Sequence, residues 1–309
     1  AAIVTDAARD RLTIDWPPFR SRTRLMLVAL ASGDVLRELG PQQQVLSGAR
    51  VSADARFSAP LGAAAVLTGA DGVAQRLYAG DHSGRVWRVD LPPLPRAADA
   101  AALWRGTLLA DLAPTTGNRV PGFSLAPDLV RSVDAQGRPF DGILLASGRE
   151  GATPDTQGAV GGGLFFLRDY AVSVRSPGAE ASPVITASDL MPAPAAKGAG
   201  AGWFAAYQRA GEVASHSPYA DGGRVFLMTA AKTAGCDKPA TTFTYIFNLT
   251  DGRPLTDTLP GSVAGVGQLG GPGIDGQDIL LPGRGIAVPV MPGEIPRYRA
   301  RFHAVGVFT

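Results

Sequence analysis

Polar and apolar positions alternate most clearly in residues 76–91, and this stretch predicts a β-hairpin. Its strands are expected at Leu77–Ala79 and Arg85–Asp90, with Gly-Asp and Ser-Gly dipeptides forming a tight turn between them. In the second strand, Trp87 and Arg88 fall on opposite faces, which is typical of a half-buried strand with the indole turned inward. Hairpins of this kind are the units that a β-propeller blade repeats.

Similar strand–turn–strand signals recur along the chain at irregular spacing. Further strands are predicted where aliphatic, β-branched or aromatic residues run together: Arg24–Leu30, Gly142–Ser147, Gly163–Asp169, Arg224–Thr229, Thr244–Asn248, Asp278–Leu281 and Tyr298–Phe308. Asp-Gly dipeptides, which favour hairpin turns, begin at Asp71, Asp141, Asp221, Asp251 and Asp275. The pattern predicts an all-β fold, an irregular β-propeller with long loop insertions, as a single domain over residues 1–309.

The composition fits a folded chain that is rich in turns. The 309 residues are 45% hydrophobic and 18% charged, and 39 glycines and 25 prolines favour short strands over long helices. The formal charge of +2 is too small to make nucleic acid an expected partner. No apolar run approaches the roughly 20 residues that span a bilayer, so no membrane span is expected. Alternating arginines at 20–24 and 297–301 fit solvated faces of edge strands, or a basic stripe for an acidic partner.

The stretch Leu67–Gln75 has the length of a nine-residue calcium loop, with glycine at the sixth position. Asp71 would supply a carboxylate, Gln75 an amide oxygen and Val73 a backbone carbonyl. Calcium takes roughly six to eight oxygen ligands and prefers several anionic ones. A single carboxylate therefore leaves a degenerate loop that should not hold calcium tightly. An Asp-Gly turn is the favoured interpretation, and no metal or cofactor is expected.

Other patterns that could carry chemistry are weak. Gly265–Gly270 matches G-x-G-x-x-G but runs into Gly-Pro-Gly, which cannot open the helix that a dinucleotide site needs. The histidines His82, His216 and His303 lie far apart, without a second ligand at metal spacing. No nucleophile elbow occurs, and the single cysteine, Cys236, has no neighbouring histidine and no internal disulfide partner. These observations favour a protein that is not an enzyme and has no catalytic residues.

Several blocks of sequence, taken in order, carry a resemblance to a known family. They are Leu27–Leu36, Leu67–Leu91, Phe140–Glu150, Phe165–Asp169, Gly202-Trp203, Gly211-Glu212, Gly223–Thr229 and Cys236. Together they resemble the C-terminal domain of PilY-type type IV pilus biogenesis factors of Gram-negative bacteria. The family implies an irregular, quinoprotein-like β-propeller that forms the C-terminal part of a longer exported protein. It also implies a place at the pilus tip, in the periplasm, the outer membrane or on the cell surface.

As partners, the resemblance implies the minor pilins of the tip and a host or abiotic surface ligand, with roles in pilus extension, retraction, twitching and attachment. Family members often carry an Asp-rich calcium loop where this chain has Leu67–Gln75, so calcium control is not expected here. The chain begins at Ala1 without a methionine, which fits a mature form or an excised fragment that left the partner of Cys236 behind. Two alternatives stay open. One is a quinoprotein-like dehydrogenase, disfavoured by the single cysteine and the degenerate loop, and the other is a periplasmic propeller scaffold for outer-membrane assembly.

Overall fold

The computed structural model describes residues 2–6, 24–28, 35–39, 61–69, 73–91, 105–113, 122–148, 162–172, 183–195, 200–209, 211–231, 241–255, 259–261, 273–275, 278–281 and 286–289. Within these residues the chain is built of strands, and its helical structure is the short 3-10 helix η2 (Ala187–Asp189). The all-β prediction is confirmed for this part of the chain. Asp71, Gly265–Gly270, His303 and Cys236 lie outside the described residues. No helix in the described ranges has the length and apolar character needed to cross a membrane.

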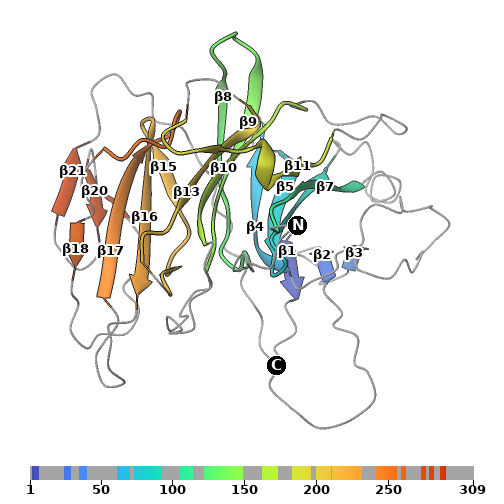
Figure 1. Cartoon of the computed structure of the whole chain (residues 1–309). Helices are drawn as coiled ribbons and strands as arrows, with labels where there is room; N and C mark the ends of the chain where they lie inside the picture. Colours follow the sequence, from blue (N-terminus) through green and yellow to red (C-terminus); the bar gives the residue numbers. More distant parts are fainter. Residues whose placement is uncertain are drawn as a thin grey trace, which may run out of the picture.

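The described strands form five sheets that follow one another along the chain (Figure 1). The first sheet has the order β1-β2-β3, with β1 (Ala2–Asp6), β2 (Arg24–Val28) and β3 (Val35–Leu39). The second has the order β11-β7-β6-β5-β4, with β4 (Leu61–Thr68), β5 (Ala74–Asp81), β6 (Arg85–Asp90), β7 (Arg105–Asp111) and β11 (Ile185–Thr186). The third has the order β12-β13-β10-β9-β8, with β8 (Asp128–Val133), β9 (Pro139–Ala146), β10 (Gly163–Asp169), β12 (Met191–Pro192) and β13 (Gly202–Ala206).

The fourth and fifth sheets are built from the C-terminal part of the chain. The fourth has the order β14-β16-β17-β18, with β14 (Val213–Ala214), β16 (Arg224–Ala231), β17 (Thr241–Asn248) and β18 (Leu259–Gly261), and β15 (Tyr219–Asp221) also pairs with β16. The fifth consists of β19 (Gly273–Asp275), β20 (Asp278–Leu281) and β21 (Ile286–Pro289). The strands predicted at Arg224–Thr229 and Thr244–Asn248 are confirmed as β16 and β17, which are antiparallel neighbours.

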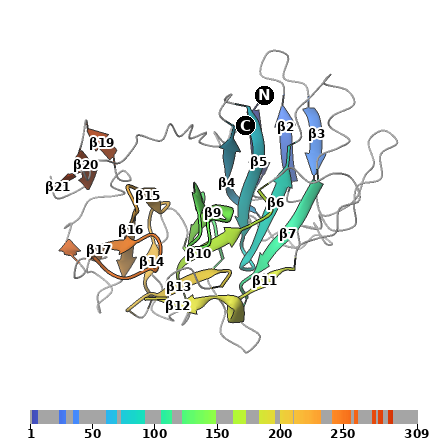
Figure 2. The ribbon, with the colours of Figure 1, turned by 90° about the horizontal axis from the view of Figure 1, so that it is seen from above.

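Neighbouring sheets contact each other through strands that come early in the sequence of each sheet. Strand β1 contacts β4, β4 contacts β8, and β8 contacts β15. Seen from above in Figure 2, the sheets succeed one another in chain order. This sheet-by-sheet succession is propeller-like, and the described residues do not show a closed ring.

Apolar side chains fill the spaces between successive sheets. Each space is represented by one buried residue from either side: Leu25 and Trp87 between the first and second sheets, Val86 and Phe165 between the second and third, and Phe166 and Val225 between the third and fourth. Strand β10 is buried along its whole length because its alternate side chains enter different clusters. The same packing makes the half-buried prediction for β6 wrong. Arg88 is only 1% exposed, since the third sheet covers the face that carries it.

The predicted hairpin of residues 76–91 is confirmed, and an aspartate organises its turn. Strands β5 and β6 pair antiparallel, and Asp81 lies at the end of β5. Asp81 Oδ1 accepts hydrogen bonds from the backbone N–H groups of Ser83 (2.8 Å) and Arg85 (3.0 Å). Its Oδ2 accepts from Nε1 of the buried Trp87 at 3.0 Å. One carboxylate therefore fixes both the turn and the inward indole.

The predicted Asp-Gly turns had different outcomes. Asp221, Asp251 and Asp275 do lie at turns, at the β15–β16 connection, after β17 and at the β19–β20 connection. The prediction for Asp141 is wrong, because Asp141 lies inside β9. Position 142 needs a glycine because the side chains of Val130 and Phe166 pack directly against its backbone. A Cβ at this position would lie 2.6 Å from Val130 Cγ2 and 2.7 Å from the Phe166 ring.

A backbone seam ties together the ends of the second, third and fourth sheets. The Phe123 N–H donates to the carbonyl of Asp81 at 2.8 Å. Phe123 also forms a parallel bridge with Gly148, which forms another with Ala214, and the Ala214 N–H donates to the carbonyl of Ser147 at 3.1 Å. Gly148 has φ +151°, and a Cβ there would lie 2.5 Å from the Ala214 carbonyl oxygen. Only glycine allows this close approach.

Candidate functional site

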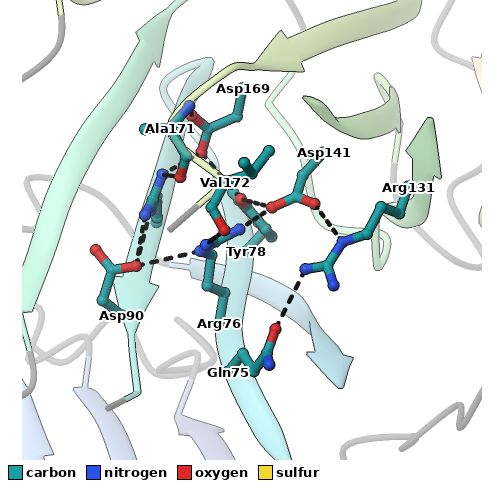
Figure 3. Close-up of polar contacts among 10 residues, drawn as sticks. Gln75, Arg76, Tyr78, Asp90, Arg131, Asp141, Asp169, Ala171 and Val172 are labelled. Carbon is teal, nitrogen blue, oxygen red and sulfur yellow. Dashed lines mark hydrogen bonds and ion pairs between the residues drawn. The ribbon is translucent and has the colours of Figure 1, made fainter. Parts of the chain in front are cut away.

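Six side chains from the second and third sheets form a buried polar group, the ionic cluster (Figure 3). Its members are Arg76, Tyr78, Arg88, Asp90, Asp141 and Asp169, none of which is more than 3% exposed. The strand period of two places the members on β5 on one face, and the register sets Arg76 opposite Asp90 and Tyr78 opposite Arg88. On the facing sheet, Asp141 of β9 lies opposite Asp169 of β10.

Arg88 joins the two sheets through its guanidinium group. Its Nε and Nη2 donate to Asp90 Oδ1 at 3.0 and 2.6 Å. Its Nη1 donates to Asp169 Oδ2 at 2.6 Å and to the carbonyl of Ala171 at 2.7 Å. Burial acts to lower the pKa of Arg88, but the carboxylates of Asp169 and Asp90 outweigh it and raise the pKa above its ordinary value. Arg88 is therefore a permanently charged link between the sheets.

Arg76 makes the second link between the sheets, and Arg131 contacts the same aspartate, Asp141, from its other side. Arg76 Nη1 donates to Asp141 Oδ2, its Nη2 donates to the carbonyl of Val172, and its Nε lies 3.4 Å from Asp90 Oδ1. The other oxygen of Asp141 accepts from Arg131 Nε at 3.0 Å. Arg131 lies on β8 and is 44% exposed. This series of contacts therefore runs from the buried cluster to the surface.

Tyr78 adds a hydrogen-bond donor at the centre of the ionic cluster. Its hydroxyl donates to Asp169 Oδ2 at 2.9 Å and lies 3.4 Å from Asp141 Oδ2. Burial raises the pKa of Tyr78 well above its ordinary value, and the nearby carboxylates of Asp169 and Asp141 raise it further. The phenol thus stays protonated and keeps its role as a donor.

The charges of this group balance. Three arginines, Arg131 included, face three aspartates, and each carboxylate accepts from at least one guanidinium. Carboxylates paired with guanidinium groups in this way attach two sheets to each other, and removing one partner leaves a buried charge uncompensated. The arrangement therefore provides cohesion between the two sheets.

A second buried carboxylate, Glu212, anchors the connection between β13 and β14. Its Oε1 accepts from Thr229 Oγ1 and from the Tyr245 hydroxyl, the latter at 2.6 Å. Its Oε2 accepts from the backbone N–H groups of Gln208 and Arg209, both at 3.1 Å. Burial raises the pKa of Tyr245, and Glu212 raises it further. This group fixes a loop onto β16 and β17 and leaves no carboxylate oxygen unused.

Of the three predicted calcium-type residues, Val73 and Gln75 have other partners in the structure. Asp71 lies outside the described residues. Val73 is exposed, and its carbonyl accepts from the Gly69 N–H at 2.8 Å. Gln75 Oε1 accepts from Arg131 Nη2 at 3.2 Å. Across the described ranges, no three His, Cys, Asp or Glu side chains are grouped so that they could hold a metal ion.

The two described histidines each contact a serine. His82 lies exposed in the β5–β6 turn, and its Nε2 is 2.9 Å from Ser124 Oγ. His216 lies between β14 and β15, and its Nδ1 is 3.0 Å from Ser215 Oγ. Both histidines therefore lie in connections between strands.

Sequence reasoning missed the ionic cluster. It assigned Arg88 to the polar face of a half-buried strand and Asp141 to a turn. One signal was present: Arg88 and Asp90 are opposite charges two residues apart, separated by Val89 and preceded by Val86-Trp87. Two opposite charges on one strand face fit a buried ion pair as well as a solvated face, so the signal alone does not decide between them.

The fold is similar to one that is known from crystallography. The crystal structure of the Pseudomonas aeruginosa PilY1 C-terminal domain superimposes with a TM-score of 0.55 and 19% sequence identity, over 75% of this chain and 54% of that chain. The present chain thus spans about half the length of the PilY1 chain it matches. No protein-family model matches the sequence, and no curated protein matches it. The resemblance expected from the sequence is confirmed at the level of the fold.

Proposed function

We propose that the chain is a non-enzymatic module of type IV pilus assembly and surface attachment that acts at the pilus tip with minor pilins. The observation that carries this proposal is the likeness in fold to the PilY1 C-terminal domain over 75% of the chain. The ordered sequence blocks that resemble the same family support it. In this role the protein is exported to the periplasm, outer membrane or cell surface and takes part in pilus extension, retraction and twitching.

The proposal extends to the architecture. The successive sheets are blades of an irregular, quinoprotein-like propeller, and their outer surfaces dock partners. The edge contacts from β1 to β4, β4 to β8 and β8 to β15, and the apolar clusters between the sheets, support this reading.

The absence of enzymatic activity is part of the proposal. Its support is that both carboxylate oxygens of Asp141, Asp169 and Glu212 accept from arginine, tyrosine, threonine or backbone donors. A quinoprotein-like dehydrogenase would instead show a cofactor absorbance and oxidise alcohols or sugars in a dye-coupled assay. Either result with the purified protein would overturn this part of the proposal.

The pilus role is tested by deleting the gene in its own organism. We expect loss of surface pili, of twitching and of attachment, all restored by the wild-type gene. Normal piliation, twitching and attachment in the deletion strain would refute the proposal.

Complementation with two variants ties the phenotype to the folded module. Arg88→Met removes a buried member of the ionic cluster. Arg85 lies on the same strand as Arg88, and Arg85→Met removes only its partly exposed ion pair with Asp111 of β7. We expect Arg85→Met to restore piliation and Arg88→Met to restore it less well.

Direct binding separates the proposed role from that of a periplasmic scaffold. Purified minor pilins of the same organism should be retained by the immobilised wild-type chain and by Arg85→Met. Loss of pili in the deletion strain without any retention of minor pilins would favour the scaffold and contradict the proposed tip partnership.

A further inference from the structure

Gln75 and Arg131 connect the start of β5 to β8 of the next sheet. The Gln75 amide oxygen accepts from Arg131 Nη2 at 3.2 Å. Arg131 is itself anchored, because its Nε donates to Oδ1 of the buried Asp141 at 3.0 Å. Asp141 is anchored in turn by Arg76 through its other oxygen. The chain segment that leads into β5 is thereby tied to the ionic cluster by a side-chain cation (Figure 3).

The oxygens here do not fit a calcium ion. Calcium needs roughly six to eight oxygen ligands, several of them anionic. The Gln75 oxygen faces a guanidinium group, whose positive charge repels a divalent cation at this distance. Both oxygens of Asp141, the carboxylate that Arg131 contacts, already accept from arginines. The Val73 carbonyl accepts from the Gly69 N–H.

We propose that the Arg131 guanidinium is an internal substitute for a loop-bound cation, so that the start of β5 is held at Gln75 without calcium. In an Asp-rich calcium loop, the metal joins oxygens from several positions of the loop. Here the guanidinium joins the Gln75 amide oxygen to the Asp141 carboxylate, and its planar fork of donors suits two acceptors at once. This inference goes beyond the pilus role and does not depend on it.

Two measurements on the purified chain test the proposal. The thermal unfolding temperature should be the same in millimolar calcium and in excess chelator, because a ligand that binds only the folded state raises that temperature. Arg131→Gln should lower it by about 2–4 °C. Hydrogen exchange at residues 73–75 should become roughly tenfold faster in this variant, because local opening is no longer resisted.

Control variants make the result specific. Arg138→Gln removes another exposed ion pair in the β8–β9 hairpin, with Asp134, and should leave exchange at residues 73–75 unchanged. Arg131→Lys keeps the charge but loses the fork and should restore protection only in part. Gln75→Leu tests the same link from its other side and should also speed exchange there.

Stabilisation of the wild-type chain by calcium would overturn the proposal. So would unchanged exchange at residues 73–75 in both Arg131→Gln and Gln75→Leu.

Discussion

Replacing Arg88 by methionine tests whether the ionic cluster holds the second and third sheets together. Methionine keeps an unbranched side chain of similar length but removes the guanidinium group. The substitution deletes four hydrogen bonds, two to Asp90 and one each to Asp169 and the Ala171 carbonyl. Two buried carboxylates then lose their main source of positive charge.

The size of the effect follows from what remains at each carboxylate. Breaking a buried ion pair by removing one partner costs about 3–5 kcal/mol. Asp169 keeps the Tyr78 hydroxyl at 2.9 Å and the Ala171 N–H at 3.0 Å, and Asp90 keeps Arg76 Nε at 3.4 Å. These contacts place the expected loss near the lower end, about 3 kcal/mol. The entropy of unfolding is roughly 2.1 cal/mol/K per residue, so over the 309 residues of the chain that loss lowers Tm by about 5 °C.

Urea unfolding followed by circular dichroism measures the loss, and Arg85→Met is the matched control. Arg85 lies on the same strand and pairs with Asp111 at 3.1 Å, but both side chains are about one-third exposed. Surface pairs contribute about 0–1 kcal/mol, so the control should unfold close to the wild type. Equal effects of Arg88→Met and Arg85→Met would refute the reasoning.

A double-mutant cycle isolates the pair of Arg88 with Asp169. Asp169→Asn should be destabilising alone but cost less in the Arg88→Met background, where the carboxylate has lost its arginine. We expect a coupling of about 1–3 kcal/mol between the two substitutions. Simple additivity would mean that the contact at 2.6 Å carries no net stabilisation.

Two further predictions concern other buried groups. Burial raises the pKa of Tyr78, Tyr207 and Tyr245 in the folded state. Their neutral phenols therefore stabilise the fold fully below about pH 10, and this stabilisation is lost as the pH rises towards the folded pKa values. The free energy of unfolding should fall by about 1.4 kcal/mol per pH unit for each tyrosine. Urea titrations between roughly pH 9 and 12 measure how the free energy of unfolding depends on pH. Tyr207→Phe removes one of the titrating groups and should reduce this slope by about 1.4 kcal/mol per pH unit. Gly148→Ala should cost about 1–3 kcal/mol, because φ is +151° and the new Cβ would meet the Ala214 carbonyl. Gly137→Ala, at a positive φ with open space around it, should cost less in the same chemical denaturation.

The strands that sequence predicted well are those whose apolar runs are bounded by turn residues. The bounds predicted for Arg85–Asp90, Gly163–Asp169 and Asp278–Leu281 agree with β6, β10 and β20. Strands β11 and β12 are two residues long and pair in parallel with β7 and β13, and β7 lies far from β11 in the sequence. Such strands are defined by tertiary pairing, and no local pattern marks them.

The misreading of Asp141 has a specific cause. Asp-Gly favours a turn when glycine is needed for a positive φ, but Gly142 is needed because Val130 and Phe166 pack against its backbone. Local sequence does not separate these two uses of glycine. The same limit applies to Arg88, whose partner Asp169 lies on another sheet.

The ionic cluster also restricts how the second and third sheets pack. Their facing surfaces are otherwise aliphatic and aromatic, as at Val86 and Phe165, and apolar packing alone is non-directional. Sliding one sheet by two residues along a strand would separate Asp169 from Arg88, which stays with Asp90 on its own strand, and would leave the Asp169 carboxylate buried without its arginine. Uncompensated buried charges cost about 3–5 kcal/mol, a large part of the roughly 5–15 kcal/mol by which a domain is stable. The balanced charges therefore select one register between two sheets that apolar contacts alone would hold less specifically.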